Sequence, residues 1–142
     1  MKIVILGNGI AGITAARHIR KRSDHAITVI SDESEHFFSR TALMYVYMGH
    51  MRFRDTQPYE NWFWEKNRIA LLRARIERID FQEKKLFTTK GEIVAYDKLL
   101  LAVGSKSNKF GWPGQDLDGV HGLYHFQDLE AMERHTPGLE RA

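Results

Sequence analysis

The sequence of 142 residues contains no cysteine. This absence excludes disulfide bonds, thiolate metal ligands and a redox-active dithiol within the chain. Long hydrophobic runs are also missing, because nowhere do about 18 apolar residues follow one another, the length that a membrane-spanning helix needs. Charge of one sign is missing as well, since 21 Lys and Arg residues stand against 18 Asp and Glu residues and leave a net charge of +3. So small an excess does not indicate nucleic acid as a partner.

The composition that remains is that of one globular domain. At about 100–200 residues per domain, the length allows one domain of ordinary size. Contents of 43% hydrophobic and 27% charged residues are ordinary for a globular protein. The short apolar run after Met1 and Lys2 ends at Gly7, too soon for a signal peptide. We therefore expect a cytoplasmic protein without a membrane span.

The first 31 residues predict a strand, a helix and a second strand. Lys2–Leu6 is apolar without alternation, as in a strand that is buried on both faces. Apolar side chains recur along one helical face from Ile10 to Ile19, and the basic run that follows suits a helix C-terminus. Ala26–Ile30 is a second apolar strand. Two parallel strands joined by a right-handed crossover are expected.

The rest of the chain predicts short elements around a third buried strand, Lys98–Val103. Lys90-Gly91 marks a hairpin turn, and the fold class is α/β with a Rossmann-like parallel sheet flanked by helices and a small antiparallel β-meander. Helices are expected over 41–48, 61–66 and 128–135, strands over 69–72, 75–81, 84–89, 92–96 and 121–126, and a loop over 104–119. The aromatic run 62–64 is interpreted as core packing, with an exposed docking patch as the alternative.

Three glycines follow the first strand in the pattern G-x-G-x-x-G. Gly7 would let the chain turn sharply, Gly9 would let the backbone approach a pyrophosphate, and Gly12 would let the helix pack closely against the strand. Ile10 and Ala11 open the helix, whose unpaired N–H groups and positive end attract phosphate oxygens. The position directly after a predicted strand favours a dinucleotide site over a glycine turn without a ligand.

A carboxylate stands close to where a dinucleotide fold places its ribose ligand. Asp32 lies 20 residues beyond Gly12. Ser31 holds the position directly after the last apolar residue of the strand, so the carboxylate is displaced, and Glu33 is a second candidate. The alternative is that both acids only form a solvated turn. His121 and His125 are four residues apart but lack a third ligand, so no metal site is expected.

Three stretches, in the same order along the chain, resemble the pyridine nucleotide-disulfide oxidoreductase superfamily. Residues 3–12 look like its FAD-binding start, and residues 27–33 followed by 38–43 resemble its ferredoxin reductase-like branch. Tyr96–Gly104 is similar to the Tyr-Asp-x-Leu-apolar-apolar-Ala-Thr-Gly signature, and residues 112–114, 119–120 and 127–128 continue the match. The implied architecture is part of the FAD/NAD(P)-binding fold.

The resemblance implies FAD as the cofactor and assigns residues to it in groups. Asp32 or Glu33 would bind the adenosine ribose, and the backbone of Ile76 would meet the adenine edge. Arg40 would lie beside the pyrophosphate and flavin, where a planar cation suits phosphate oxygens, with a surface arginine as the alternative. The residues of the glycine turn would hold the pyrophosphate: Gly7, Gly9, Ile10, Ala11 and Gly12. Ala102, Val103 and Gly104 would line the middle of the cofactor.

The sequence departs from the family pattern beside Arg40. Thr41 replaces a proline, and Met44 and Tyr45 replace the serine and lysine that end the motif, so a cation close to the isoalloxazine in relatives is lost. No catalytic residue is assigned, and the role of Tyr45 stays open. Val103 replaces the threonine of the third signature. The lack of cysteine excludes the branch that reduces disulfides.

The length also departs from the family pattern. Neither the second glycine motif for NAD(P)H nor the returning Gly-Asp motif is present, so residues 1–142 are expected to be the N-terminal part of the FAD-binding domain of a longer flavoenzyme. A free-standing half-domain is the alternative. By itself the chain would hold FAD without efficient turnover of NAD(P)H.

The implied function of the parent protein is transfer of electrons from NAD(P)H through FAD to a ferredoxin-like protein, a quinone or another acceptor. Its oligomeric state stays open. One alternative is a single-domain NAD(P)-binding dehydrogenase or redox-sensing module that uses the same glycine turn. Another is an interaction domain in which the turn binds nothing.

Overall fold

The computed structural model describes residues 1–138, and the chain divides into two compact units. Unit 1 consists of Met1–Phe38 and Pro58–Gly104, and unit 2 of Ser39–Gln57 with the chain from Ser105 onward. Each unit is formed by segments that are distant in the sequence. No helix among the described residues is long and apolar enough to cross a membrane.

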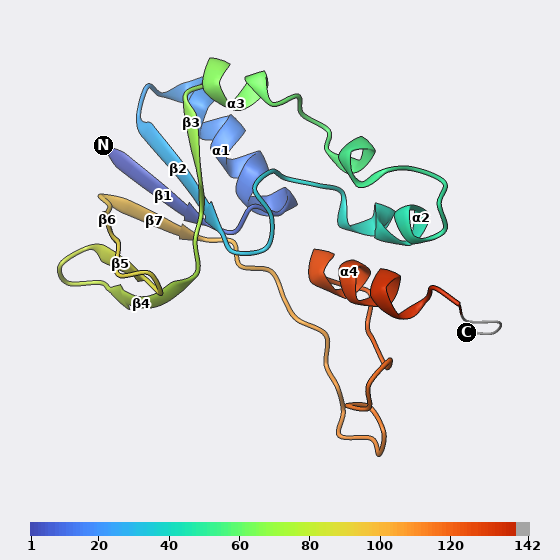
Figure 1. The fold of residues 1–142 in the computed structure, drawn as a ribbon. Helices are drawn as coiled ribbons and strands as arrows, with labels where there is room; N and C mark the ends of the chain where they lie inside the picture. The colour runs from blue at the N-terminus through green and yellow to red at the C-terminus, as the bar shows by residue number, and fades with distance from the viewer. Residues whose placement is uncertain (139–142) are drawn as a thin grey trace. The chain divides into compact units, whose positions relative to one another are not determined.

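Unit 1 is built on a four-stranded parallel sheet with the strand order β3-β2-β1-β7 (Figure 1). Its strands are β1 (Lys2–Leu6), β2 (Ala26–Ser31), β3 (Ile69–Arg73) and β7 (Lys98–Leu101). The helix α1 (Ile10–Arg22) connects β1 to β2, which pair in parallel. The predicted strand-helix-strand unit and the α/β fold class are therefore confirmed.

The two faces of this sheet bury different sets of side chains, because alternate residues of a strand point to opposite sides. On one face, Ile5 and Val29 pack in a cluster with Ile13 and Ala16 of α1. On the other face, Val4, Leu6, Ile30 and Leu86 belong to a second cluster. Each fully buried aliphatic side chain contributes roughly 1.5–3 kcal/mol relative to an exposed one. The sheet is thus stabilised from both sides, as its unbroken apolar strands predict.

The second face is covered by a three-stranded antiparallel sheet with the order β4-β5-β6. Its strands are β4 (Ile76–Asp80), β5 (Lys85–Thr88) and β6 (Ile93–Ala95). The turn between β5 and β6 is built around Thr88, whose Oγ1 accepts hydrogen bonds from the N–H groups of Lys90 (3.3 Å) and Glu92 (3.1 Å). Gly91 takes a φ of +82° there, which glycine adopts without strain. The predicted hairpin and meander are confirmed.

The aromatic run 62–64 lies in α3 (Trp62–Lys66), and its members differ in burial. Trp64 is 4% exposed and packs in the cluster on the α1 face of the sheet. Trp62 is 58% exposed, with the Lys66 ammonium 5.1 Å from its ring centroid. The expectation of core packing is right for Trp64 and wrong for Trp62, because successive residues of a helix point about 100° apart and cannot share one face.

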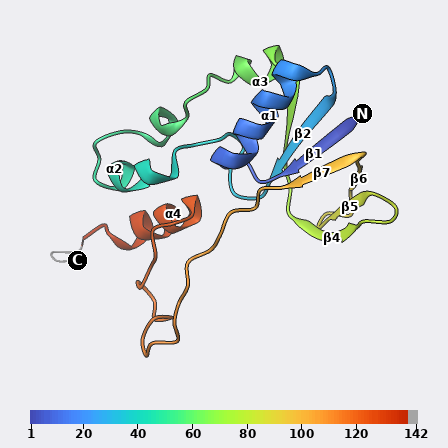
Figure 2. The ribbon, with the colours of Figure 1, turned by 180° about the vertical axis from the view of Figure 1, so that it is seen from behind.

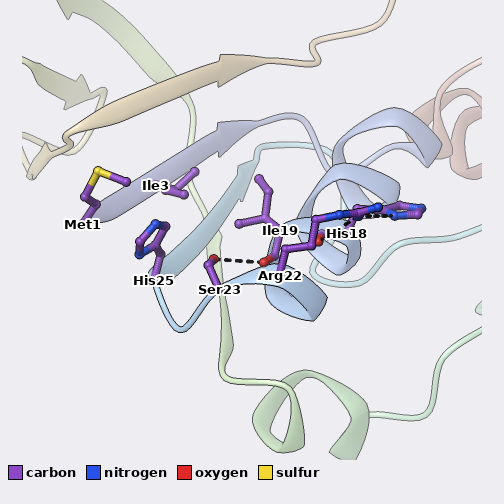
Figure 3. A pocket seen from close by; sticks show the side chains of 7 residues that line it. All are labelled: Met1, Ile3, His18, Ile19, Arg22, Ser23 and His25. Atoms are coloured by element: carbon purple, nitrogen blue, oxygen red, sulfur yellow. Dashed lines mark hydrogen bonds between the residues drawn. The ribbon is translucent and has the colours of Figure 1, made fainter.

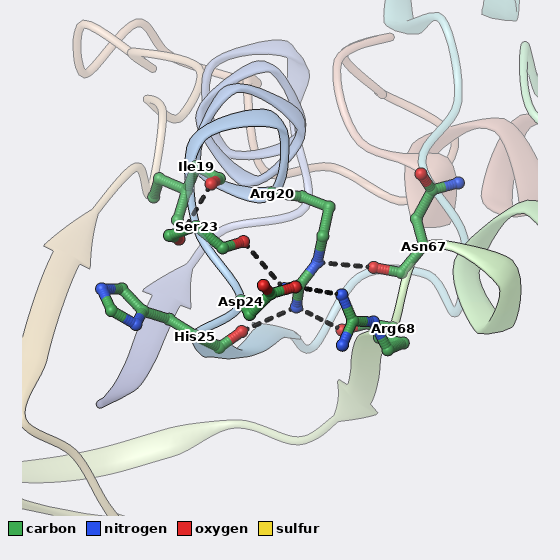
Figure 4. Close-up of polar contacts among 7 residues, drawn as sticks. All are labelled: Ile19, Arg20, Ser23, Asp24, His25, Asn67 and Arg68. Carbon is green, nitrogen blue, oxygen red and sulfur yellow. Dashed lines mark hydrogen bonds and ion pairs between the residues drawn. The ribbon is translucent and has the colours of Figure 1, made fainter.

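The amino edge of the parallel sheet is fastened by the guanidinium of Arg20 in α1 (Figure 4). Arg20 donates hydrogen bonds to the backbone carbonyls of Ser23 (3.1 Å), His25 (2.7 Å), Asn67 (2.7 Å) and Arg68 (2.9 Å). One planar fork therefore joins the end of α1, the start of β2 and the start of β3. The Arg68 side chain pairs with Asp24, and this hydrogen bond lowers the pKa of the Asp24 carboxyl.

Unit 2 contains short helical elements. They are η1 (Arg40–Ala42), α2 (Leu43–Tyr47), η2 (Phe53–Thr56) and α4 (Phe126–His135). Helices α2 and α4 lie side by side, as the views from both sides show (Figures 1 and 2). The rings of Phe53 and Phe126 are 4.2 Å apart between centroids, and the hydroxyls of Tyr47 and Thr136 are 2.9 Å apart. The helices predicted over 41–48 and 128–135 are confirmed, with shifted ends.

The strand predicted over residues 121–126 is wrong. The Asp128 carboxylate accepts hydrogen bonds from the N–H groups of Tyr124 (2.9 Å) and His125 (2.7 Å), and α4 begins at the next residue, Phe126. These two donors are therefore not available to a neighbouring strand. The glycine-rich stretch 104–119 forms neither helix nor strand, as predicted.

Candidate functional site

The strand register of unit 1 gathers most of the predicted site residues at the carboxyl edge of the parallel sheet. Leu6 pairs with Ile30 of β2 and with Leu101 of β7, and Ile30 pairs with Leu72 of β3. The glycine turn, the two acids after β2 and the residues after β7 therefore follow strand ends that lie next to one another. In open α/β sheets, ligands bind in the crevice outside the carboxyl ends of the strands, where the strand order reverses. Here that point lies between β1 and β7.

Gly7 is enclosed by the protein itself. Its N–H donates to the Ile30 carbonyl (2.8 Å), and its φ of +111° disfavours any side chain. A Cβ at this position would lie 2.0 Å from the carbonyl oxygen of Ala102. Ala102 is held in turn by a 2.7 Å hydrogen bond from its N–H to the Leu6 carbonyl. The close approach of β1 and β7 therefore requires glycine here.

Gly12 is also required by packing, whereas Gly9 is not. A Cβ on Gly12 would lie 2.0 Å from the Gly7 carbonyl oxygen, so α1 could not start so close to the turn. Gly9 has an ordinary extended backbone, with φ −86° and ψ −177°, and a Cβ there would meet nothing within 4 Å. The fold leaves open space beside Gly9 that its own side chains do not fill. This open space is where the pyrophosphate of the expected cofactor would lie.

The N-terminus of α1 adjoins this open space. Gly9 is the N-cap and offers no side-chain acceptor, and the first turn of α1 carries no acidic residue. The first intrahelical bond runs from the Ile13 N–H to the Gly9 carbonyl (3.0 Å), so the N–H groups of Ile10, Ala11 and Gly12 precede the helical ladder. Together with the helix dipole, these donors suit an anion. The glycine turn therefore fits a pyrophosphate.

The two acidic candidates follow β2 at the same edge. Asp32 is exposed, and its carboxylate lies 3.8 Å from a guanidinium nitrogen of Arg75. The Glu33 N–H donates to the Ser31 hydroxyl (3.3 Å), which fixes the turn between the strand and the acids. Ser31 is the last residue of β2 and pairs with Arg73. The placement agrees with the expected ribose ligand, and the ribose role of either acid stays a prediction.

The remaining candidates of unit 1 surround the same edge. Ile76 begins β4 shortly after β3 ends, and its side chain packs against the second core cluster. Ala74, between these strands, donates its N–H to the Ser31 carbonyl (3.0 Å), which ties the start of β4 to the end of β2. Val103 and Gly104 are exposed beyond the end of β7, and Gly104 has a φ of +66°.

Arg40 belongs to unit 2, whereas the other candidates belong to unit 1. It is half-buried at the start of η1, and its guanidinium carbon is 4.6 Å from the centroid of the Tyr124 ring. Arg40 also donates a hydrogen bond to the Tyr124 carbonyl. Tyr45, which replaces the family lysine, is exposed on α2, with its ring 6.2 Å from that of His50. The cofactor role of Arg40 stays a prediction.

Sequence reasoning missed Asn8, the residue between the first two glycines. Its side-chain Nδ2 donates to the backbone carbonyl of Glu35 (3.2 Å). Its Oδ1 is buried and has no hydrogen-bond partner among the described residues. In the sequence, Asn8 stands at the first x of G-x-G-x-x-G, where the motif accepts any residue, so the pattern gave no reason to select it.

A shallow groove of about 440 Å³ lies at the opposite, amino edge of the sheet (Figure 3). Its lining residues are Met1, Ile3, His18, Ile19, Arg22, Ser23 and His25. None of them is a predicted site residue, and the carboxyl ends of the strands point away from this edge. The groove is therefore separate from the candidate site.

The histidines near the end of the chain form a small polar cluster in unit 2. His121 Nε2 is 3.1 Å from His135 Nδ1, and His135 Nε2 donates to Asp118 (3.0 Å). The bond from His135 Nδ1 to the Ala131 carbonyl raises the pKa of His135, and Asp118 adds to this effect. Within residues 1–138, no group of three acidic or histidine side chains is arranged to hold a metal ion.

Comparison with known proteins agrees with this geometry. The family model for pyridine nucleotide-disulphide oxidoreductases matches residues 1–140. The chain belongs to this family. Membership supports FAD as the cofactor.

Two bacterial reductases are among the relatives of this chain. The ferredoxin–NAD(+) reductase component of the biphenyl dioxygenase system of Paraburkholderia xenovorans is 29% identical over 134 residues, which cover 93% of this chain and 33% of that protein. Rubredoxin-NAD(+) reductase of Pseudomonas putida is 31% identical over 137 residues, 94% of this chain and 36% of that protein.

A solved structure gives the same assignment. The crystal structure of NADH:rubredoxin oxidoreductase from Clostridium acetobutylicum superposes with a TM-score of 0.82 and 30% identity, covering 94% of this chain and 35% of that chain. This chain thus spans about a third of the length of these relatives.

Proposed function

We propose that residues 1–142 form the N-terminal, FAD-binding part of an NAD(P)H-dependent flavin oxidoreductase. The observation that carries the proposal is the contrast among the three glycines. Gly7 and Gly12 are demanded by contacts within the protein, whereas Gly9 borders open space at an uncapped helix N-terminus. A glycine that packing does not require, next to unpaired N–H donors, is what a bound pyrophosphate explains.

Within this proposal, different residues of the carboxyl edge bind different parts of the cofactor. The first-turn N–H groups of α1 hold the pyrophosphate, and Asp32 or Glu33 accepts hydrogen bonds from the adenosine ribose. Ile76 offers its backbone to the adenine edge, and Ala102–Gly104 line the middle of the cofactor. Arg40 would add a planar cation to the phosphates. Bound FAD supplies the chemistry of accepting a hydride from NAD(P)H and releasing electrons to an acceptor.

The proposed acceptor of the parent enzyme is a small iron-containing electron carrier of the ferredoxin or rubredoxin type. Support comes from the relatives, two of which are named as rubredoxin reductases and one as a ferredoxin reductase component. A quinone or another acceptor remains an alternative. By itself the chain is expected to bind FAD and to oxidise NADH slowly.

Titration of the chain with FAD, followed by quenching of flavin fluorescence, tests the proposal. Wild type should bind FAD more tightly than NAD, and Gly9→Ala should bind FAD at least about tenfold more weakly, because the added Cβ occupies the space left for the phosphate. Gly122→Ala is the matched control: its Cβ would make an ordinary 3.6 Å contact with Ser107 Oγ.

Two results would contradict the proposal. One is a Gly9→Ala variant that binds FAD as tightly as wild type does. The other is a wild-type chain that binds NAD more tightly than FAD in the same titration. The second result would favour the single-domain NAD(P)-binding module instead. Thermal unfolding of ligand-free Gly9→Ala should match wild type, which separates loss of binding from loss of fold.

A further inference from the structure

The side chain of Asn8 connects two parts of the candidate site that are far apart in the sequence. Its Nδ2 donates to the Glu35 carbonyl at 3.2 Å, across 27 residues. Asn8 belongs to the glycine turn before α1, and Glu35 belongs to the segment that follows β2 and carries Asp32 and Glu33. One hydrogen bond therefore joins the phosphate end of the site to its acidic end.

The segment after β2 has further contacts at its start and at its end. At its start, the Glu33 N–H donates to the Ser31 hydroxyl (3.3 Å). At its end, Phe37 is buried in the core cluster on the α1 face, and the buried Ser34 hydroxyl donates to the His36 carbonyl (2.8 Å). The bond from Asn8 to Glu35 lies between these anchors. It fixes how far the acids stand from the glycine turn.

The other half of the Asn8 amide is not used by the fold. Its Oδ1 is buried without a hydrogen-bond partner among the described residues. A buried carbonyl oxygen that lacks a partner is costly, whereas an apolar side chain of similar size carries no such cost. The Oδ1 atom therefore adds nothing to the stability of the ligand-free fold, and the amide acts on the segment after β2 through its Nδ2 bond.

We propose that Asn8 is a positioning residue that sets the distance between the N–H groups at the start of α1 and the carboxylates of Asp32 and Glu33. This inference rests on the proposed function. A dinucleotide binds more tightly when its pyrophosphate and ribose meet two subsites that are already correctly spaced, because less ordering remains to be done on binding. Asn8 touches neither group and acts through the segment that it holds.

A double-mutant cycle on FAD binding tests this role. Asn8→Ala should weaken FAD binding about tenfold in the wild-type background, the size of effect expected for one lost polar contact. In an Asp32→Asn, Glu33→Gln background, the same change should weaken binding by less than about twofold, because the carboxylates that it positions are gone. Unfolding of ligand-free Asn8→Ala should stay close to wild type.

Asn61→Ala is the matched control. Asn61 is exposed at the start of α3 in the same unit, and its side chain makes no capping hydrogen bond. FAD affinity of this variant should equal that of wild type. If Asn8→Ala does not fold, the same cycle is run with Asn8→Leu, which has a similar shape but lacks the Nδ2 donor and adds no charge.

The outcomes separate this inference from the function on which it rests. Wild type that binds FAD, together with an Asn8 variant of equal affinity, overturns the role of Asn8 and leaves the proposed function standing. A loss of equal size in both backgrounds also overturns it, because the effect would not pass through the carboxylates. Wild type that fails to bind FAD removes the proposed function and this inference together.

Discussion

Unit 1 and unit 2 are stabilised by different kinds of contact. In unit 1, four parallel strands pair in a continuous register, and both clusters of buried residues described above lie there. In unit 2, short helices meet through individual side chains, such as the rings of Phe53 and Phe126 or the guanidinium of Arg40 on Tyr124. Backbone pairing places a whole edge at once, whereas side-chain contacts place one residue at a time.

This difference determines what each unit contributes to function. The register of unit 1 brings the glycine turn and the acids after β2 to one edge without any special side chain. The position of Arg40 depends on its contacts with Tyr124. We therefore expect the sheet edge to tolerate changes of surface residues and to fail abruptly when its backbone contacts are disturbed.

Gly7→Ala should produce the largest effect. The added Cβ would clash with the Ala102 carbonyl at 2.0 Å, in a backbone with φ +111°. Strain of this kind costs about 3 kcal/mol or more, because neither strand can move without breaking pairs with its neighbours. Urea unfolding should show this loss, while Gly9→Ala should unfold like wild type. Equal stability of all three proteins would mean that β1 and β7 are not held as closely as described.

Arg20→Lys should have the next largest effect, at the other edge of the same sheet. The lysine keeps the charge but cannot bond four carbonyls from one plane. We expect a loss of about 2 kcal/mol in the free energy of unfolding. Arg22→Lys is the control, since among the described residues Arg22 hydrogen-bonds to His18 within the same helix, α1. A smaller loss of unfolding free energy for Arg20→Lys than for Arg22→Lys would contradict the role of Arg20 in fastening the amino edge of the sheet.

Arg40→Lys tests the side-chain contacts of unit 2. Weakening of the cation–π contact with Tyr124 should cost about 1 kcal/mol. Because the described residues of unit 2 form no sheet, amide hydrogen exchange should become faster at the start of α4 while β1 and β2 keep their protection. Uniformly faster exchange throughout the chain would show that the two units unfold as one. The same variant should weaken FAD binding if Arg40 contacts phosphate.

The contrast also explains what could be predicted from the sequence. Unbroken apolar runs such as Lys2–Leu6 reveal a strand that is buried on both faces, and the glycine pattern after it reveals the turn. The residues at the carboxyl edge of the sheet were therefore predictable, because parallel strand register brings the ends of these strands together. The strand expected over residues 121–126 was wrong because the Asp128 carboxylate caps α4 through the N–H groups of Tyr124 and His125. A local apolar pattern does not reveal such a cap.

Individual side-chain contacts were the other limit. The bond from Asn8 to Glu35 joins residues 27 apart, and the pair formed by Asp32 and Arg75 joins the ends of different strands. Neither is encoded in periodicity, because each depends on how separate segments are brought together. The exposure of Trp62 beside the buried Trp64 has the same origin, since helix orientation is set by packing.

His135 should give the smallest effect and the one that is most specific to unit 2. Its hydrogen bonds to the Ala131 carbonyl and to Asp118 raise its pKa above the ordinary value, against the opposing effects of partial desolvation and of the Arg134 charge. A raised folded-state pKa means that the stabilisation is fully present below the unfolded-state value and is lost as pH rises through the folded-state value. The expected window therefore begins near pH 6.5 and extends upward.

Thermal unfolding of wild type and His135→Gln at two pH values measures this effect. The difference between the two proteins should be larger at about pH 5.5 than at about pH 8, because only the protonated ring donates from both nitrogens. Asp118→Asn removes the charged partner of the same ring, so in this background the difference at low pH should become smaller. Asn108→Ala, at an exposed position of unit 2, is the control, because neither asparagine nor alanine titrates between these pH values. A His135→Gln difference that is the same at both pH values would mean that unit 2 does not depend on this charge.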